Sequence, residues 1–172
     1  EDPFYPWPGI GSYEFYRADA RALFWIAFVE KADSFSYWAS NYWNYRCPPL
    51  DEEKTFFPEW DTWNKSRMPG DGVLLYPGRS GILPSLRLAA LRDGEEDYEM
   101  LATFAAARGR AAAEEAAAEV VAGINDVSRS YERYRSARRR IAAACEQSAP
   151  CRNYGQRIKN SFSPLTRGRT NF

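Results

Sequence analysis

The 172-residue sequence contains no histidine and only three cysteines. Without histidine, neither a Ser-His-Asp nor a Cys-His nucleophile system can be built, and histidine zinc sites are excluded. Cys47, Cys145 and Cys151 form no C-x-x-C pair, so we do not expect a thiolate metal site. No apolar run approaches the roughly 20 residues of a membrane-spanning helix, so we expect no membrane span. We also expect no cofactor.

The formal net charge of zero conceals an asymmetry along the chain. Residues 1–128 contain 12 basic and 21 acidic residues, a net charge of −9, whereas residues 129–172 contain 11 basic and 2 acidic residues, a net charge of +9. A basic tail could bind nucleic acid or an acidic membrane. No nucleic-acid motif accompanies the charge, so we expect the tail to dock on the acidic part of its own chain or on a protein partner.

Apolar periodicity predicts several helices. A first helix over 12–32 has a buried stripe that neighbouring apolar residues widen, so we expect it to be covered on more than one side. Ser85 is suited to cap a second helix, an alanine-rich helix follows over 102–122, and a last helix begins at Ser128 and ends near Glu146. The predicted buried positions are Ala18, Ala22, Trp25 and Val29 in the first helix, Leu86, Ala90, Tyr98 and Leu101 in the second, and Tyr131, Tyr134, Ala137 and Ile141 in the last.

Two short segments are predicted as strands. Residues 34–38 are rich in aromatic side chains, and residues 72–76 form a near-continuous apolar run typical of a strand buried on both faces. The long segment 39–71 between them has the length of a functional loop. Two strands cannot form a protected sheet. The sequence therefore predicts the C-terminal part of a larger α/β domain, completed by the remainder of that domain or by a partner chain.

Three segments carry a family resemblance. The first is Arg21-x-x-x-Trp25 followed by Phe35-Ser36-Tyr37-Trp38 and Asn41-x-Trp43; the second is the run from Gly70 to Gly78; the third is Pro84-Ser85-Leu86-Arg87-Leu88 continuing through Leu91-Arg92-Asp93-Gly94 to Glu99. Together they resemble the C-terminal end of the catalytic domain of glycoside hydrolase family 123.

The resemblance implies an α/β fold in which this chain is the C-terminal portion of a (β/α)8 TIM-type barrel, with two strands plus helices. Such a barrel has eight strands and about 250 residues. We therefore expect strand-helix units of the barrel over 1–101, a helical extension packing on the barrel over 102–147, and a basic irregular tail over 148–172.

The resemblance also implies a chemistry. Family members resemble retaining β-N-acetylgalactosaminidases, in which the acetamido group of the substrate is the nucleophile, an aspartate orients it, and a glutamate is the general acid/base. That Asp-Glu pair belongs to an earlier barrel strand, and no position here matches its motif. Neither Asp51-Glu52-Glu53 nor Glu95-Glu96-Asp97 is assigned a catalytic role, because the first lies in a polar loop and the second in a structural helix motif.

Barrel enzymes have their active sites at the C-terminal ends of the strands. Aromatic rings stack on the apolar faces of sugars, and an amide can bond to hydroxyls, so residues at these strand ends are candidates for a sugar-binding rim. The alternative is that a tryptophan there only closes the barrel core. The candidates are Tyr37, Trp38, Asn41, Trp43 and Tyr76.

Two other groups of residues remain. Arg87, Arg92, Asp93, Glu96 and Asp97 form a dense charge cluster, which we interpret as a structural latch that ties the last helix to the barrel rather than as a binding site. A glycosylation sequon at Asn64 and a disulfide between Cys145 and Cys151 would both suit a secreted protein. The alternative is three reduced thiols in a cytosolic protein.

Two functions remain open at this point. The chain is the C-terminal part of a glycosidase acting on β-linked N-acetylgalactosaminides, with a carbohydrate as its substrate. Alternatively, it is a non-catalytic glycan-binding or structural subunit of a larger assembly derived from that fold.

Overall fold

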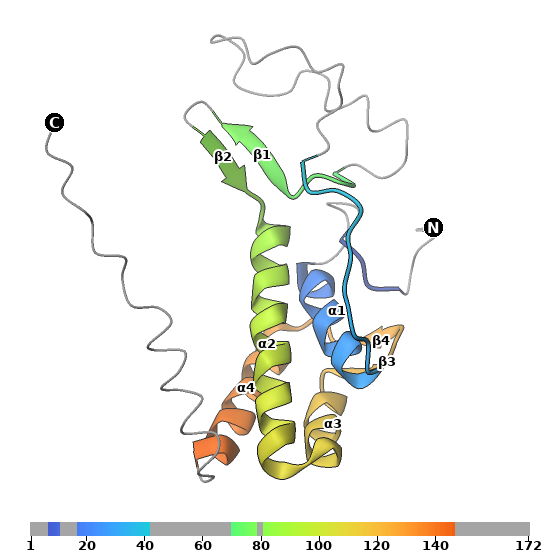
Figure 1. The fold of residues 1–172 in the computed structure, drawn as a ribbon, viewed down its shortest axis with the longest axis vertical. Helices are drawn as coiled ribbons and strands as arrows, with labels where there is room; N and C mark the ends of the chain where they lie inside the picture. The colour runs from blue at the N-terminus through green and yellow to red at the C-terminus, as the bar shows by residue number, and fades with distance from the viewer. Residues whose placement is uncertain (1–6, 11–16, 42–69, 79–80, 147–172) are drawn as a thin grey trace, which may run out of the picture.

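The computed structural model describes residues 7–10, 17–41, 70–78 and 81–146. These residues form helices and two small antiparallel hairpins (Figure 1). The helices are α1 (Arg17–Val29), α2 (Leu86–Arg108), α3 (Arg110–Ala118) and α4 (Tyr131–Glu146), and the hairpins pair β1 (Leu75–Gly78) with β2 (Gly81–Pro84) and β3 (Val121–Gly123) with β4 (Asp126–Val127). None of the described helices is long and apolar enough to cross a membrane.

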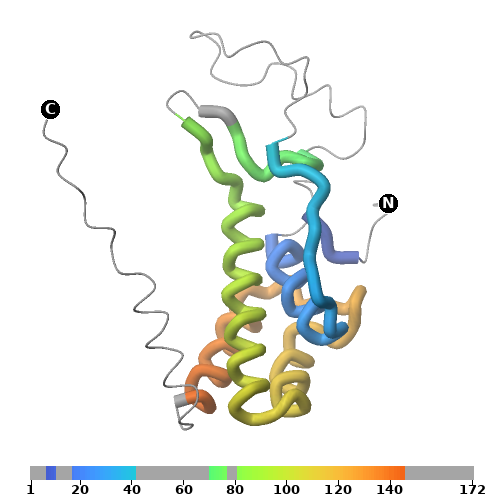
Figure 2. Tube along the Cα trace, viewed as in Figure 1, coloured from blue at the N-terminus to red at the C-terminus, as the bar shows by residue number. Residues whose placement is uncertain are grey.

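The long helix α2 organises the arrangement. The tube trace in Figure 2 shows α1 beside α2, the β1–β2 hairpin beyond the start of α2, and α3 and α4 near its other end. Ser85 caps α2, because its Oγ accepts a hydrogen bond from the Leu88 N–H at 3.0 Å. This confirms the predicted cap and start of the helix.

Helix α1 is buried on two sides, as predicted. Ala22 and Trp25 belong to a large core shared with α2, α3 and α4. Ala20 belongs to a second core, which also contains Leu74. Trp25 and Tyr134 are both fully buried, and their rings meet edge to face with centroids 5.7 Å apart. The first core therefore joins α1 to α4.

The other helices differ from their predictions mainly at the ends. The alanine-rich segment continues α2 to Arg108, and Gly109 rather than Gly123 separates it from α3. Residues 121–127 form the β3–β4 hairpin, although 121 and 122 belong to the predicted alanine-rich helix, and α4 begins at Tyr131 instead of Ser128. Leu86, predicted to be buried, is 65% exposed because it is the first residue of α2 and lies beyond the core.

Both strand predictions are wrong in detail. Residues 34–38 are in the described part of the chain and form no strand, because no backbone among the described residues pairs with them. The second strand spans 75–78 rather than 72–76, and it pairs antiparallel with β2, whose residues are all exposed. Val73 and Leu74 account for the apolar run, since both are buried just before the strand begins. The mixed α/β character stands, and the barrel remains a prediction.

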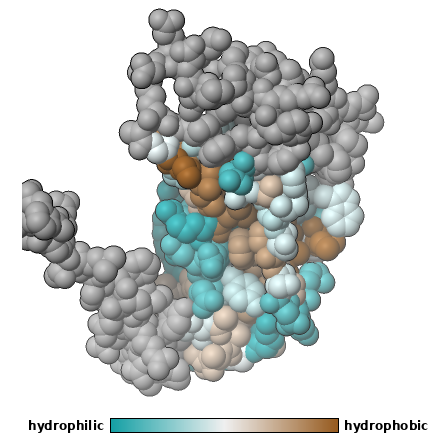
Figure 3. Space-filling model, turned by 45° about the horizontal axis from the view of Figure 1, so that its top comes forward, coloured by the Kyte–Doolittle hydropathy of each residue, from teal (hydrophilic) through white to brown (hydrophobic). Residues whose placement is uncertain are grey.

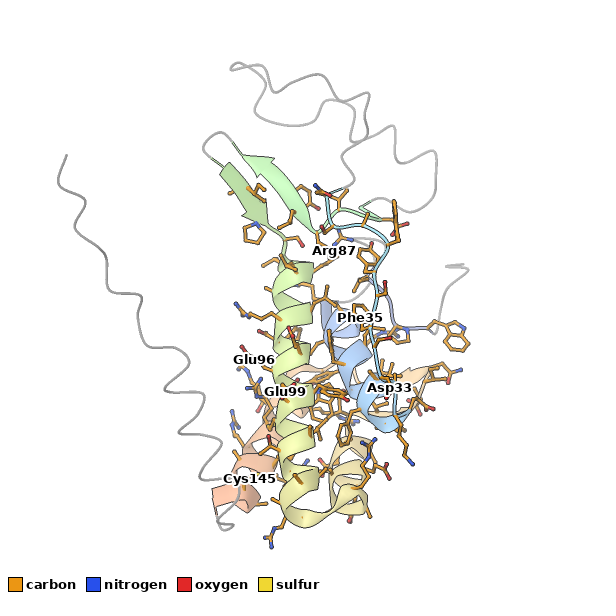
Figure 4. All side chains as sticks on the ribbon, viewed as in Figure 1. Asp33, Phe35, Arg87, Glu96, Glu99 and Cys145 are labelled. Carbon is orange, nitrogen blue, oxygen red and sulfur yellow. The ribbon has the colours of Figure 1, made fainter. Side chains whose placement is uncertain are left out.

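A buried carboxylate joins three helices. Asp97 of α2 is fully buried and accepts hydrogen bonds from Arg21 Nε at 2.5 Å, Trp25 Nε1 at 2.7 Å and Arg138 Nη1 at 2.8 Å. Two of these donors belong to α1, and the third belongs to α4. The rest of the predicted charge cluster belongs to this network only in part. Arg92 and Asp93 form an exposed ion pair. Glu96, which lies with Glu99 on an outer face of α2 (Figure 4), forms an ion pair with Arg138 at 3.6 Å.

A second buried carboxylate, that of Asp19, accepts fewer hydrogen bonds. Asp19 of α1 is fully buried, and its Oδ1 accepts a hydrogen bond from Arg129 Nε at 3.2 Å. Its Oδ2 has no hydrogen-bond partner among the described residues. Burial raises the pKa of Asp19 above its ordinary value, and Arg129 offsets only part of that effect.

This arrangement predicts a pH-dependent effect of Asp19→Asn. Because the pKa of Asp19 is higher in the folded state, its stabilising contribution is complete below the unfolded value of 3.8 and is lost as the pH rises through the folded pKa. The asparagine side chain of the variant is uncharged at every pH. We expect its free energy of unfolding to rise relative to that of the wild type between pH 3 and pH 7.

Urea unfolding across this pH range measures the difference. Asp33→Asn, which removes an exposed carboxylate, is the control for the loss of one negative charge. Parallel pH profiles for the wild type and Asp19→Asn would contradict the prediction.

Candidate functional site

The candidate site lies where the extended segment 33–41 meets residues 70–76. The Ser40 carbonyl oxygen accepts hydrogen bonds from the N–H groups of Leu74 and Leu75 at 2.7 and 2.9 Å, and Asn41 forms an isolated antiparallel bridge with Val73. At the other end of the segment, the Phe35 ring packs against Phe24 of α1 with centroids 5.1 Å apart (Figure 4). These contacts bring together two segments that are more than 30 residues apart in the sequence.

One carboxylate oxygen positions two neighbouring aromatic side chains of the first motif, Tyr37 and Trp38. Asp71 Oδ1 accepts a hydrogen bond from the Tyr37 hydroxyl at 2.8 Å and another from Trp38 Nε1 at 3.0 Å. The Tyr37 oxygen in turn accepts a hydrogen bond from the Gly72 N–H at 2.7 Å. Since the Tyr37 oxygen accepts from Gly72, its proton is directed to Asp71, and the orientation of this hydroxyl is fixed.

Gly72 provides the space for the Trp38 indole. A Cβ atom at Gly72 would lie 2.4 Å from Cζ2 of Trp38, and Gly72 has a φ of +72°, which L-residues with side chains rarely adopt. Trp38 is nevertheless 57% exposed. The protein therefore orients a large, solvent-accessible aromatic ring without burying it.

Arg87 holds the backbone beside the site in place. Its guanidinium donates hydrogen bonds to the carbonyl oxygens of Ile10 and Val73 at 2.7 and 2.5 Å, and to the Tyr76 hydroxyl at the long distance of 3.5 Å. Figure 4 shows Arg87 at the end of α2 nearest the β1–β2 hairpin. Arg87 is buried, so it fixes the backbone of the turn before β1 and is not part of a latch around α4.

Tyr37 stays protonated well above neutral pH. Burial raises its pKa to about 12, and Asp71 adds to the effect, while the Gly72 N–H and Arg87 oppose it. The hydroxyl is therefore a hydrogen-bond donor to Asp71 at physiological pH. It is not suited to act as a general base.

The structure brings only part of the predicted rim together. Tyr37 and Trp38 lie side by side, with ring centroids 6.5 Å apart. The Tyr76 hydroxyl contacts Arg87 at 3.5 Å. Asn41 is exposed, and its backbone forms the bridge to Val73. Trp43, Asn64, Cys47 and Cys151 lie outside the described residues, as does the basic irregular tail predicted over 148–172. Cys145 is half-buried near the end of α4, far from the site (Figure 4), and its pairing with Cys151 stays a prediction.

Asp71 was missed by the sequence reasoning. An aspartate between two glycines is typical of a turn, and the second motif contains Asp71 without indicating a role for its side chain. The signal in the sequence is Gly70-Asp71-Gly72 directly before an apolar run, which puts a carboxylate in a turn at the start of the predicted strand.

The described residues contain no group of three or more histidine, cysteine, aspartate or glutamate side chains arranged to hold a metal ion. Apolar side chains are exposed beside the site instead. Ile82 and Leu83 of β2 are 60% and 57% exposed, and Figure 3 shows hydrophobic residues on the surface at this end of the molecule. The site is therefore a shallow aromatic and apolar surface with one carboxylate.

One family model matches the chain. The family model described as glycoside hydrolase 123, catalytic domain, matches residues 15–104, which is more than half of the chain. The chain belongs to this glycoside hydrolase family. The match includes α1, the site and most of α2, and it ends before α3. No similar protein was found among curated proteins.

Proposed function

We propose that this chain is the C-terminal part of the catalytic domain of a glycosidase that hydrolyses β-linked N-acetylgalactosaminides. The proposed mechanism is retaining and substrate-assisted: the acetamido group of the sugar attacks the anomeric carbon, and an Asp-Glu pair on an earlier strand of a (β/α)8 barrel, outside this chain, orients it and transfers the proton. Membership of the glycoside hydrolase 123 family supports the class of reaction.

The contribution proposed for this chain is a sugar-binding rim. The observation that carries it is Trp38, an indole that is 57% exposed and yet positioned by Asp71 and by the absence of a side chain at Gly72. An exposed ring fixed in this way loses little conformational freedom when a ligand stacks on it. Its apolar face suits the C–H face of a pyranose, and the neighbouring Tyr37 ring lies 6.5 Å from it between centroids. Tyr76 is proposed as a further residue of the rim.

The experiment measures hydrolysis of 4-nitrophenyl N-acetyl-β-galactosaminide by the full-length protein that contains this chain. We expect Trp38→Ala to raise KM about tenfold, because stacking on an aromatic ring contributes on the order of 1–2 kcal/mol. Trp38→Phe, which keeps a ring but loses the N–H, should fall between Trp38→Ala and the wild type. Trp7→Ala is the control, since Trp7 is 50% exposed and makes no contact with the site among the described residues.

An unchanged KM for Trp38→Ala would contradict the rim. Binding of N-acetylgalactosaminides without hydrolysis by the full-length protein would favour the alternative, a non-catalytic glycan-binding or structural subunit. We also propose that the protein is secreted, since Asn64 is in a sequon and Cys145 is six residues from Cys151. A mass shift after enzymatic removal of N-glycans tests this proposal.

A further inference from the structure

The carboxylate of Asp71 has unused capacity to accept hydrogen bonds. A carboxylate can accept about four hydrogen bonds through its two oxygens. Within the described residues, Tyr37 and Trp38 both donate to Oδ1, and no hydrogen bond reaches Oδ2. Asp71 is only half-buried, and no ion pair neutralises its charge in this part of the chain. Arg87 donates to Ile10, Val73 and Tyr76 instead of to Asp71.

The unused oxygen lies next to an exposed aromatic ring. Oδ1 binds the indole N–H at the edge of Trp38, and Oδ2 is attached to the same carboxyl carbon. A pyranose that stacks on the indole presents its hydroxyl groups around its rim, in the direction of the ring edge. A carboxylate beside that edge is a strong acceptor for a hydroxyl hydrogen, because hydrogen bonds to charged groups are about twice as strong as neutral ones.

We propose that Asp71 has two roles in the sugar-binding rim: Oδ1 positions Trp38 and Tyr37, and Oδ2 accepts a hydrogen bond from a hydroxyl group of the pyranose that stacks on Trp38. The proposal rests on the proposed function and names a further substrate-binding residue for it. It assigns the recognition of a sugar hydroxyl to a residue that the aromatic motif alone does not contain.

The two roles can be separated by two substitutions at the same position. Asp71→Asn keeps an amide oxygen that can accept from Tyr37 and Trp38, but it replaces the second oxygen by an NH2 group, which donates hydrogen bonds. Asp71→Ala removes both acceptors. The Asn variant therefore changes the sugar contact while it preserves the position of the indole.

The experiment uses the full-length protein and methyl N-acetyl-β-galactosaminide as the probe, with Kd measured by calorimetry and the tryptophan environment measured by near-UV circular dichroism. We expect Asp71→Asn to raise Kd about 10- to 100-fold with a near-UV spectrum like that of the wild type. Asp71→Ala should raise Kd by at least as much and should also change the spectrum.

Four results would overturn the proposal, and they have different meanings. Wild-type affinity in Asp71→Asn with weak binding in Asp71→Ala would mean that Asp71 only positions Trp38. Wild-type affinity in both Asp71 variants, with weak binding in Trp38→Ala, would remove Asp71 from the site and leave the rim intact. Absence of sugar binding by the wild-type protein, or wild-type affinity in Trp38→Ala, would overturn the proposed function as well.

Discussion

Asp97→Ala is expected to lower the free energy of unfolding by about 3–5 kcal/mol, the range typical of removing one partner from a buried ion pair. The Arg21 side chain is 5% exposed and lies directly on the Asp97 carboxylate, so its charge would remain buried without a partner. The fully buried Trp25 would also lose the acceptor for its indole N–H. A loss of this size is a large part of the 5–15 kcal/mol that stabilises a typical domain.

Urea unfolding followed by tryptophan fluorescence measures the effect. Asp93→Ala is the matched control, because Asp93 lies one turn earlier on the same helix and pairs with Arg92, whose side chain is 67% exposed. Exposed pairs of this kind contribute less than about 1 kcal/mol. If the two variants differ by less than 1 kcal/mol, the buried network does not stabilise the fold as the structure indicates.

The network also explains how the C-terminal helix is connected to the family domain. The family match ends at residue 104, yet Arg138 and Arg129 of the later segment pair with the buried carboxylates of Asp97 and Asp19. Tyr134 of α4 is fully buried in the same core as Trp25. Residues after the matched domain therefore complete the packing of residues within it.

Local sequence patterns predicted the helices better than the strands. The three-four spacing of Ala18, Ala22 and Trp25 indicates the buried face of a helix. This spacing can be found in the sequence without knowing which element packs on that face. A strand is defined by its neighbour, and alternation or apolar character does not reveal which backbone is alongside. Residues 34–38 have the composition of a strand but pair with no other described segment. Residues 73–74 are apolar because they are buried before β1 begins.

The candidate site shows the same limit. The aromatic pair Tyr37 and Trp38 was identified from residue type, since exposed aromatic rings suit sugars. Asp71 was not, because it lies 33 residues from Trp38 in the sequence and only the fold brings it to the indole N–H. Arg87 was assigned to the wrong contacts for a related reason: its sequence neighbours are charged, but its hydrogen bonds are to backbone carbonyls of distant segments.

Gly94→Ala is expected to lower the free energy of unfolding by about 2–3 kcal/mol, although alanine favours a helix by about 1 kcal/mol over glycine. Gly94 lies inside α2 where α1 crosses it. A Cβ there would be 2.7 Å from the Arg21 carbonyl oxygen and 2.9 Å from Cδ2 of Phe24. The first of these atoms belongs to the backbone and cannot rotate away, so α1 would have to move, and Arg21 would move with it relative to Asp97.

Gly123→Ala is the control for the substitution itself. A Cβ at Gly123 would meet only the Asp126 Cβ at 4.0 Å, which is ordinary contact, and the backbone there has no positive φ. Such a change should be neutral or stabilising by up to about 1 kcal/mol. Urea unfolding of the two variants compares the same chemical change at a tight and an open position. A higher free energy of unfolding for Gly94→Ala would contradict the prediction. It would mean that α1 and α2 leave room for a methyl group between Gly94 and the Arg21 carbonyl oxygen.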